Sequence, residues 1–401
     1  MNKEFRFYDK IYIFDGNNLE LYEKTSDDSL EQTENKISKN SDVLQKLVFN
    51  VSNTCNLNCK YCYASGGNYK RENNIMDEKT ADKIIDSIIK KYKKISVIYF
   101  FGGEPLINFK LIKHIVERFE NHYKKENLDF RTVTNGAFLT HSKLDYMGKH
   151  NFTVSLSLDG PKNIHEFLRG KGTYDQIIDS INYVKENNIP VKLCLLCTYT
   201  KYHQDNIPLE KLNKFFEQFN VDYMINTVRT DDENLTLIDN RDYEEREKEF
   251  IDVSFERILN NSKNIGVSAY LTNVIDALML HYPQRYFCKE LSDDYSLVYD
   301  YNGEEYSCLR FYGTHNKNDK LLQESNNKSR YEICNNCWCK NLCSVCMAEV
   351  ILNGKEMPFE KGVCKLPTLY EYVINKIIKL LEEDEEKLAE LLNNYYTNYI
   401  K

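Results

Sequence analysis

The chain has 401 residues, of which 42% are hydrophobic and 13% aromatic, and its formal net charge is −8. This composition is typical of a globular protein with one large domain and a smaller one. Because the net charge is negative, the chain as a whole does not attract nucleic acid or a membrane surface. This excludes the class of proteins that bind these partners through basic patches. The start, MNKEFRFYDK, lacks the apolar core of a signal peptide, and no stretch reaches the roughly 18 apolar residues of a membrane span. We therefore expect a cytoplasmic protein with neither nucleic acid nor a membrane as partner.

Residues 1–42 predict a small β-structure followed by a linker. Two short apolar runs lie on either side of Asp15-Gly16-Asn17-Asn18, which is the turn chemistry of a β-hairpin. Residues 25–42 are almost entirely polar and predict a flexible connection.

From about residue 43 to 235, short apolar strands alternate with amphipathic helices. One helical face is formed by Ala81, Ile84, Ile85 and Ile88. Six consecutive βα units imply a parallel sheet with helices outside, either a partial barrel or an open doubly wound sheet. The predicted strands are 43–52, 95–101, 130–134, 152–158, 191–199 and 221–228.

The rest of the chain divides into three predicted parts. Residues 236–284 form a helical connection, residues 285–366 a cysteine-rich domain, and residues 367–401 a C-terminal helix. The cysteines themselves are clustered: of 13, three lie within 55–62 and seven within 308–364. Such clustering in a long chain favours metal ligands over disulfides. By contrast, Cys194 and Cys197 lie three apart on a predicted strand, and we expect both to be structural.

The first cysteine group follows the first strand of the alternating region. The segment NVSNTCNLNCKYCYASGG spaces Cys55, Cys59 and Cys62 as Cys-x3-Cys-x2-Cys. Three thiolates can hold three corners of a cubane iron–sulfur cluster, which normally takes four cysteines, and so leave one iron open. Zinc is the competing metal, but structural zinc usually has a closed set of four ligands.

This segment, with Tyr61 before the last cysteine, resembles the CxxxCxΦC signature of radical S-adenosylmethionine (SAM) enzymes. The resemblance implies that Cys55, Cys59 and Cys62 hold a [4Fe–4S] cluster whose open iron binds SAM. An electron from the cluster would then cleave SAM to a 5′-deoxyadenosyl radical. The resemblance also implies an α/β fold, a partial (β/α)6 TIM-type barrel, in agreement with the six units above.

Two further motifs, together with Ser157 and Arg169, resemble features of the same family. Gly102-Gly103-Glu104-Pro105 follows the second strand and is similar to the GGEP motif, and Thr134-Asn135-Gly136 follows the third and is similar to the TNG turn. From the residues alone, the first could be an ordinary strand-to-helix turn, and Arg169 a surface residue. The resemblance implies SAM contacts for Gly102, Gly103, Glu104, Asn135, Ser157 and Arg169.

The second cysteine group resembles the SPASM extension of radical SAM enzymes. Its CxxC pairs alone would suit a zinc module, but seven cysteines exceed one zinc site. The resemblance implies two auxiliary [4Fe–4S] clusters, and Trp338 is expected to shield their ligands. Cys334, Cys337, Cys343 and Cys364 would hold the second cluster, and Cys288, Cys308 and Cys346 the first.

Two features depart from the SPASM pattern. Two residues rather than three separate Cys343 from Cys346, and Cys339 is additional. No cysteine shortly before Cys288 supplies a fourth ligand to the first auxiliary cluster. That cluster either has an open iron, which would suit a substrate thiolate, or is closed by Cys339; alternatively Cys339 is a spare thiol.

SPASM enzymes mostly modify peptides, and this chain resembles maturases that make ranthipeptides and sactipeptides. The resemblance implies that the enzyme joins a cysteine sulfur to a carbon as a thioether. Its substrate would be a ribosomally made, cysteine-containing precursor peptide, and its electron donor a flavodoxin or ferredoxin. Residues 1–42 are shorter than the winged-helix leader-binding element of many such maturases, so the hairpin either contacts a leader peptide or caps the barrel.

Other activities stay open. An anaerobic sulfatase maturase would make formylglycine, but in those enzymes an acidic base follows the position of Cys308, where this chain has Leu309 and Arg310. Carbon–carbon or carbon–oxygen crosslinking of a peptide is a further alternative. In a non-catalytic metal-binding scaffold, the GGEP and TNG motifs would have no role.

Overall fold

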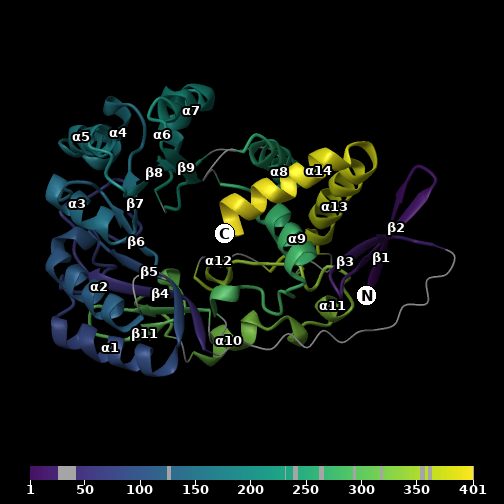
Figure 1. Ribbon diagram of the computed structural model, residues 1–401, viewed down its shortest axis with the longest axis horizontal. Coiled ribbons are helices and arrows are strands. Elements are labelled where there is room, and N and C mark those ends of the chain that lie inside the picture. The colour runs from purple at the N-terminus through teal and green to yellow at the C-terminus, as the bar shows by residue number, and fades with distance from the viewer. Residues whose placement is uncertain are drawn as a thin grey trace. The chain divides into compact units, whose positions relative to one another are not determined.

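The chain forms two compact units, and each combines segments that are distant in sequence (Figure 1). The barrel unit contains Asn40–Asp239 and Asp293–Lys317, and the cysteine-rich unit contains Met1–Lys39, Asn240–Ser292 and Asn318–Lys401. The computed structural model describes residues 1–25, 42–123, 128–230, 232–237, 243–261, 266–291, 295–316, 319–352, 357–359 and 364–400. Within these ranges, no helix is both long and apolar enough to cross a membrane.

The barrel unit is built on an eight-stranded sheet in the order β11-β10-β4-β5-β6-β7-β8-β9. All six predicted strands are present, as β4 (Val43–Ser52), β5 (Lys94–Gly102), β6 (Phe130–Thr134), β7 (Phe152–Ser157), β8 (Lys192–Tyr199) and β9 (Asp222–Thr227). Each pairs in parallel with its neighbour. Two later strands extend the sheet: β10 (Ser296–Tyr299) lies parallel to β4, and β11 (Glu305–Tyr306) lies antiparallel to β10.

The strand order decides between the two predicted architectures. From β4 to β9 the sheet follows chain order without reversal, whereas a doubly wound sheet reverses its order at a switch point. Right-handed crossovers then place the helices on one face, as Figure 1 shows, which is the partial-barrel arrangement. These helices are α1 (Glu78–Lys91), α2 (Phe109–Tyr123), α3 (His141–Lys149), α4 (Lys162–Arg169), α5 (Thr173–Glu186), α6 (Lys201–Asn206) and α7 (Leu209–Glu217), with a 3-10 turn η1 (Pro105–Asn108) before α2.

The helix-facing side of the sheet is a continuous aromatic and aliphatic core. Phe49, Phe100, Phe130 and Phe152 stack across four adjacent strands, with successive ring centroids 6.4, 6.1 and 5.3 Å apart. Because side chains alternate along a strand, the opposite face of β7 carries Thr153, Ser155 and Ser157. The polar face of the sheet is thus available for a site.

The N-terminal region forms a three-stranded antiparallel sheet rather than a hairpin alone. Its strands are β1 (Asn2–Phe7), β2 (Lys10–Asp15) and β3 (Glu20–Glu23). The predicted hairpin is present as β2 and β3, and an additional strand arises because Tyr8, at a positive φ of 52°, divides the first apolar run. The predicted linker at 25–42 lies mostly outside the described residues.

The remaining elements of the cysteine-rich unit are helical. The predicted helical connection contains α8 (Tyr243–Leu259) and α9 (Ala269–Leu280). The short elements among the cysteines are η3 (Lys289–Leu291), α10 (Lys320–Asn326), η5 (Lys328–Arg330), α11 (Glu332–Asn335) and α12 (Met347–Ile351), while η4 (Leu309–Phe311) belongs to the barrel unit. Residues 293–317, predicted within the cysteine-rich domain, group with the barrel because β10 joins its sheet.

The predicted single C-terminal helix is two helices, α13 (Leu366–Glu383) and α14 (Glu385–Tyr395), followed by the π-helical turn η6 (Tyr396–Ile400). Asp384 separates them with φ −161° and ψ 77°, and its carboxylate accepts a hydrogen bond from the Lys387 amide. Aspartate is a strong N-cap, so it begins a new helix where the acidic run suggested continuity.

Candidate active site

The loop that carries Cys55, Cys59 and Cys62 follows β4 and is fastened to the end of β5. The Gly103 amide donates to the Ser52 carbonyl at 2.8 Å, and the Glu104 amide donates to the Thr54 carbonyl at 2.9 Å. The two backbones come so close that a Cβ on Gly103 would lie 2.3 Å from the Thr54 carbonyl oxygen. Glycine is required here because only a bare Cα leaves room for the cysteine loop.

Glu104 joins the GGEP motif to the TNG turn. Its side chain is fully buried and accepts hydrogen bonds from the Leu106 amide at 3.0 Å, the Thr134 hydroxyl at 2.8 Å and the Asn135 amide at 2.8 Å. Burial raises the pKa of the Glu104 carboxyl, and these donors oppose the increase. Both carboxylate oxygens are therefore bound by the protein itself, and Glu104 holds the ends of β5 and β6 in register.

The TNG turn in turn reaches the cysteine loop. The Asn135 Nδ2 lies 3.5 Å from the Cys55 Sγ and donates to the Asn56 Oδ1 at 2.9 Å. Burial raises the pKa of the Cys55 thiol, and the hydrogen bonds from Leu57 and Asn135 oppose this. Hydrogen bonds to cluster sulfurs are one of the means by which proteins adjust an iron–sulfur centre.

The Arg169 side chain is only 9% exposed and lies beside the same loop, contrary to its interpretation as a surface residue from the sequence alone. Its Nε and Nη2 donate to the Asp159 carboxylate at 2.7 and 3.2 Å, and the Tyr61 hydroxyl donates to the same carboxylate at 2.6 Å. The guanidinium lies over the Tyr61 ring, 5.4 Å from its centroid. Burial by itself raises the pKa of Asp159, but Arg169, Tyr61 and Thr198 outweigh it and hold that pKa below its usual value.

Asp159 was not among the predicted site residues. It follows the fourth strand in SLSLDG, at the strand end where barrel sites collect, and this position was the signal that could have found it. Two buried histidines fix its backbone: the Asp159 amide donates to the His165 Nδ1 at 3.3 Å, and the His203 Nε2 donates to the Asp159 carbonyl at 2.7 Å. Ser157 lies buried two residues before Asp159 at the end of β7.

In the cysteine-rich unit, five cysteines line one cavity of about 310 Å³. They are Cys334, Cys337, Cys339, Cys343 and Cys364. The cavity thus contains the four cysteines predicted for the second auxiliary cluster together with Cys339, whose Sγ lies 3.5 Å from that of Cys337. Trp338 also lines the cavity, and its ring packs edge-on against Phe5 and Phe14, with centroids 5.9 and 5.8 Å away.

The cysteines predicted for the first auxiliary cluster are divided between the two units. Cys308 follows β11 in the barrel unit, whereas Cys288 and Cys346 belong to the cysteine-rich unit. Their common ligation of a cluster stays a prediction.

A single zinc ion requires its sulfur ligands to lie close together. A tetrahedral zinc site with Zn–S bonds of about 2.3 Å places its sulfurs roughly 3.8 Å apart. Among the described residues, the group of three or more potential ligands whose atoms all lie within 4.8 Å of one another is Glu78, Asp82 and His114, and it contains no cysteine. A compact set of three thiols of that kind is thus not found among the cysteines in the described part of the chain.

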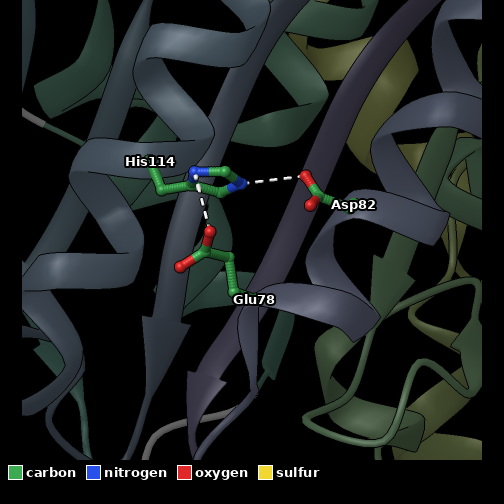
Figure 2. A group of neighbouring side chains, drawn as sticks. All are labelled: Glu78, Asp82 and His114. Carbon is green, nitrogen blue, oxygen red and sulfur yellow. Dashed lines mark hydrogen bonds and ion pairs between the residues drawn. The ribbon is translucent and has the colours of Figure 1, made fainter.

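That compact group is an interhelical ion network on the outside of the barrel (Figure 2). His114 of α2 bonds Asp82 of α1 at 2.8 Å and approaches Glu78 at 3.7 Å. Asp82 also pairs with Arg118, which pairs with Asp86 at 2.7 Å. Arg118 of α2 already neutralises the Asp82 carboxylate of α1. We therefore interpret the group as ion pairs that join α1 to α2.

Comparison with known proteins agrees with this geometry. Residues 49–215 match the model of the Radical SAM superfamily. The chain contains a radical SAM domain. Enzymes of that superfamily use a [4Fe–4S] cluster and SAM, so the match agrees with the predicted class of enzyme and with its predicted SAM-binding cluster.

Part of the chain is similar to known bacterial proteins. The radical SAM cyclopropyl synthase TigE of Paramaledivibacter caminithermalis is 32% identical over 44% of this chain and 44% of its own length. A serine-type anaerobic sulfatase-maturating enzyme of Bacteroides thetaiotaomicron is 28% identical over 36% of this chain and 37% of its own. The chain thus spans less than half the length of either relative.

A solved structure has the same fold over most of the chain. Native anSMEcpe, with bound AdoMet and the Kp18Cys peptide, gives a TM-score of 0.61 at 19% identity and covers 88% of this chain and 99% of its own. The likeness extends beyond the matched domain into the cysteine-rich unit and supports the predicted SPASM-type architecture.

Proposed function

We propose that this protein is a radical SAM enzyme that modifies a ribosomally made peptide. The observation that carries the proposal is the fastening of the Cys55–Cys62 loop to the GGEP and TNG motifs at the ends of adjacent parallel strands, within a radical SAM domain. Cys55, Cys59 and Cys62 would hold the SAM-binding cluster, and when bound this cluster supplies the electron that cleaves SAM.

Each of the surrounding residues has a defined part in this proposal. Gly102 and Gly103 give the SAM methionyl group access to bare backbone, while Glu104 fixes their position relative to Asn135. Asn135 hydrogen-bonds Cys55, and the Asp159–Arg169 pair orients the guanidinium. Ser157, on the polar face of β7, would contact the ribose.

We propose further that the bond formed is a thioether between a substrate cysteine and a carbon atom. Support comes from the resemblance to thioether-forming maturases and from the cavity of the cysteine-rich unit that five cysteines line. Carbon–carbon bond formation is the second candidate, since the relative TigE is named a cyclopropyl synthase. Formylglycine formation is favoured less, because Leu309 and Arg310 follow Cys308 in place of an acidic residue.

The decisive test of the cluster assignment is a Cys55→Ala, Cys59→Ala, Cys62→Ala triple variant. After anaerobic reconstitution we expect about twelve irons in the unaltered chain and about four fewer in the variant, which should form no 5′-deoxyadenosine from SAM. Cys194→Ala is the matched control, because this half-buried thiol lies on β8 and should leave both iron and SAM cleavage unchanged. Continued SAM cleavage by the triple variant would refute the assignment.

The chemistry is tested with a cysteine-containing precursor peptide and reduced flavodoxin or ferredoxin. A thioether product loses two hydrogens and leaves one cysteine resistant to alkylation. Loss of two hydrogens with every cysteine still alkylated would indicate carbon–carbon or carbon–oxygen crosslinking, and an aldehyde at the former cysteine would indicate formylglycine. Stoichiometric zinc without iron would support a non-catalytic scaffold.

A further inference from the structure

Lys328 is a fully buried lysine in the cysteine-rich unit, with 0% of its surface exposed. Its Nζ donates to three backbone carbonyl oxygens: Gln284 at 2.5 Å, Lys340 at 2.7 Å, and Cys343. An ammonium group has three N–H donors, so each is bound to the protein. Lysine is almost never fully buried unless its ammonium group is paired in this way. The three carbonyls therefore form a specific binding site for this ammonium group.

The neighbouring Asn326 makes an equally specific contact. It is 1% exposed, and its side-chain amide pairs with both backbone groups of Cys288: the Cys288 amide donates to Oδ1 at 2.7 Å, and Nδ2 donates to the Cys288 carbonyl at 3.0 Å. Together the side chains of Asn326 and Lys328 connect residues 284–288 to the loop 340–343. We call residues 326–328 the clamp segment.

The clamp segment brings a charge to the cysteine cavity. Lys328 lines the cavity together with Cys334, Cys337, Cys343 and Cys364. Phe287 lies against the same ammonium, 5.8 Å from ring centroid to Nζ, and helps to separate it from water. A charge in such surroundings acts far more strongly than one on the surface, because the effective dielectric constant is low.

We propose that Lys328 is a positioning residue that fixes the cysteine loop 337–343 and raises the reduction potential of the cluster held in this cavity. A cluster that gains one electron becomes more negative, and a buried positive charge beside it stabilises that reduced state. The inference rests on the proposed function, in that the cavity must hold a cluster. The mechanical connection to Cys288 means that the same segment also supports a predicted ligand of the other auxiliary cluster.

The test uses the full chain with Cys55, Cys59 and Cys62 replaced by Ala, so that the remaining iron reports on the auxiliary clusters. In this background, Lys328→Met, Lys328→Arg and the control Lys320→Met are reconstituted anaerobically. Iron content and the potential from a redox titration followed by EPR are then measured. Lys320 is an exposed lysine of α10, eight residues earlier, and its replacement removes the same formal charge.

We expect Lys328→Met to hold less iron and to show a more negative potential, while Lys320→Met behaves like the background chain. Lys328→Arg keeps the positive charge, so the reduction potential of its cluster should stay near that of the background chain. Its planar guanidinium group can bind fewer of the three carbonyls, so the iron content of this variant can fall without affecting that expectation. If Lys328→Met holds no cluster, the result for Lys328→Arg decides the question. A cluster potential in Lys328→Arg that is strongly negative relative to the background chain overturns the proposal.

Two other results would overturn it. One is an unchanged potential in Lys328→Met, and the other is an equal shift in Lys320→Met, which would reduce the effect to net charge. Failure of the proposed function looks different, because the background chain itself would then contain no iron.

Discussion

The Asp159 backbone shows how single residues set the chemistry of the candidate site. Its amide donates to the His165 Nδ1 at 3.3 Å, so the proton of the neutral imidazole lies on Nε2, which donates to the Thr173 hydroxyl at 2.8 Å. A second proton on Nδ1 would face the amide hydrogen. His203 accepts from the Thr200 amide at its Nδ1 in the same way and donates to the Asp159 carbonyl. Both imidazoles are therefore held neutral around the carboxylate that pairs with Arg169.

This arrangement predicts sensitivity to mild acid. Burial lowers the pKa of His165 from 6.5 to about 4. Between these values the unfolded chain binds a proton that the folded chain does not, so the free energy of unfolding falls as pH decreases through 6.5. At about 1.4 kcal/mol per pKa unit, the apo protein should be about 2 kcal/mol less stable at pH 5 than at pH 7, measured by urea unfolding.

His165→Gln should remove most of that difference, leaving the smaller contribution of His203, whose pKa burial also lowers. His141→Gln is the control, because the His141 side chain is 48% exposed and pairs with Asp179. An unaltered pH dependence in His165→Gln would contradict the assignment of the neutral imidazole.

At the scale of elements, the end of β5 and the cysteine loop depend on close backbone contact. A Cβ on Gly67 would lie 2.5 Å from the Gly103 Cα and 2.7 Å from the Cys55 Cβ. Gly67 also has a positive φ of 90°, whereas Gly103 does not adopt a positive φ. The two glycines therefore serve different needs: Gly67 supplies both an unusual backbone conformation and space, and Gly103 supplies space alone.

Gly103→Ala isolates the steric requirement. The added methyl group should displace the cysteine loop, lower iron content and SAM cleavage at least several-fold, and destabilise the apo protein by about 1–3 kcal/mol. Gly66→Ala is the matched control in the same loop, because its Cβ would meet its nearest atom at 3.7 Å although φ is +73°. Full iron content and SAM cleavage in Gly103→Ala would show that the loop does not need this contact.

On the scale of the whole molecule, the N-terminal sheet is an integral part of the cysteine-rich unit. Phe5 and Phe14 pack on Trp338, and the Asn341 Nδ2 donates to the Gly16 carbonyl at 2.8 Å. A Cβ on Gly16 would lie 2.0 Å from the Trp338 carbonyl oxygen. Residues at the start of the chain thus pack against Trp338, which lines a cavity whose cysteines lie more than 300 residues later.

Phe14→Ala should therefore destabilise the cysteine-rich unit by about 3 kcal/mol, because it removes a buried aromatic ring. Trp338 is the single tryptophan of the chain, so its fluorescence reports on this unit during urea unfolding of the apo protein. Tyr8→Ala is the control, since Tyr8 is 86% exposed. Equal unfolding midpoints for the two variants would show that the N-terminal sheet does not support the unit.

Local pattern was enough to predict the elements of the barrel and the position of its cysteine loop. Six strands and several helical faces were predicted because burial on one side imposes alternation on a strand and a 3.6-residue period on a helix. Cys55, Cys59 and Cys62 are close in sequence, so their joint role follows from spacing. The GGEP and TNG motifs are equally local, and the sheet brings them together because they end adjacent parallel strands.

Long-range contacts were decided only by the tertiary structure. Strand β10 is four residues long and pairs with β4 from about 250 positions away, so its own pattern could not assign it to the barrel. Arg169 and Lys328 lie in polar segments that are typical of the surface. The Asp159 carboxylate, ten residues away, satisfies Arg169, and backbone carbonyls 12 to 44 residues away satisfy Lys328. The sequence by itself determined the barrel strands and the three-cysteine loop, whereas folding decided which polar groups lose water, because burial depends on what the rest of the chain brings against them.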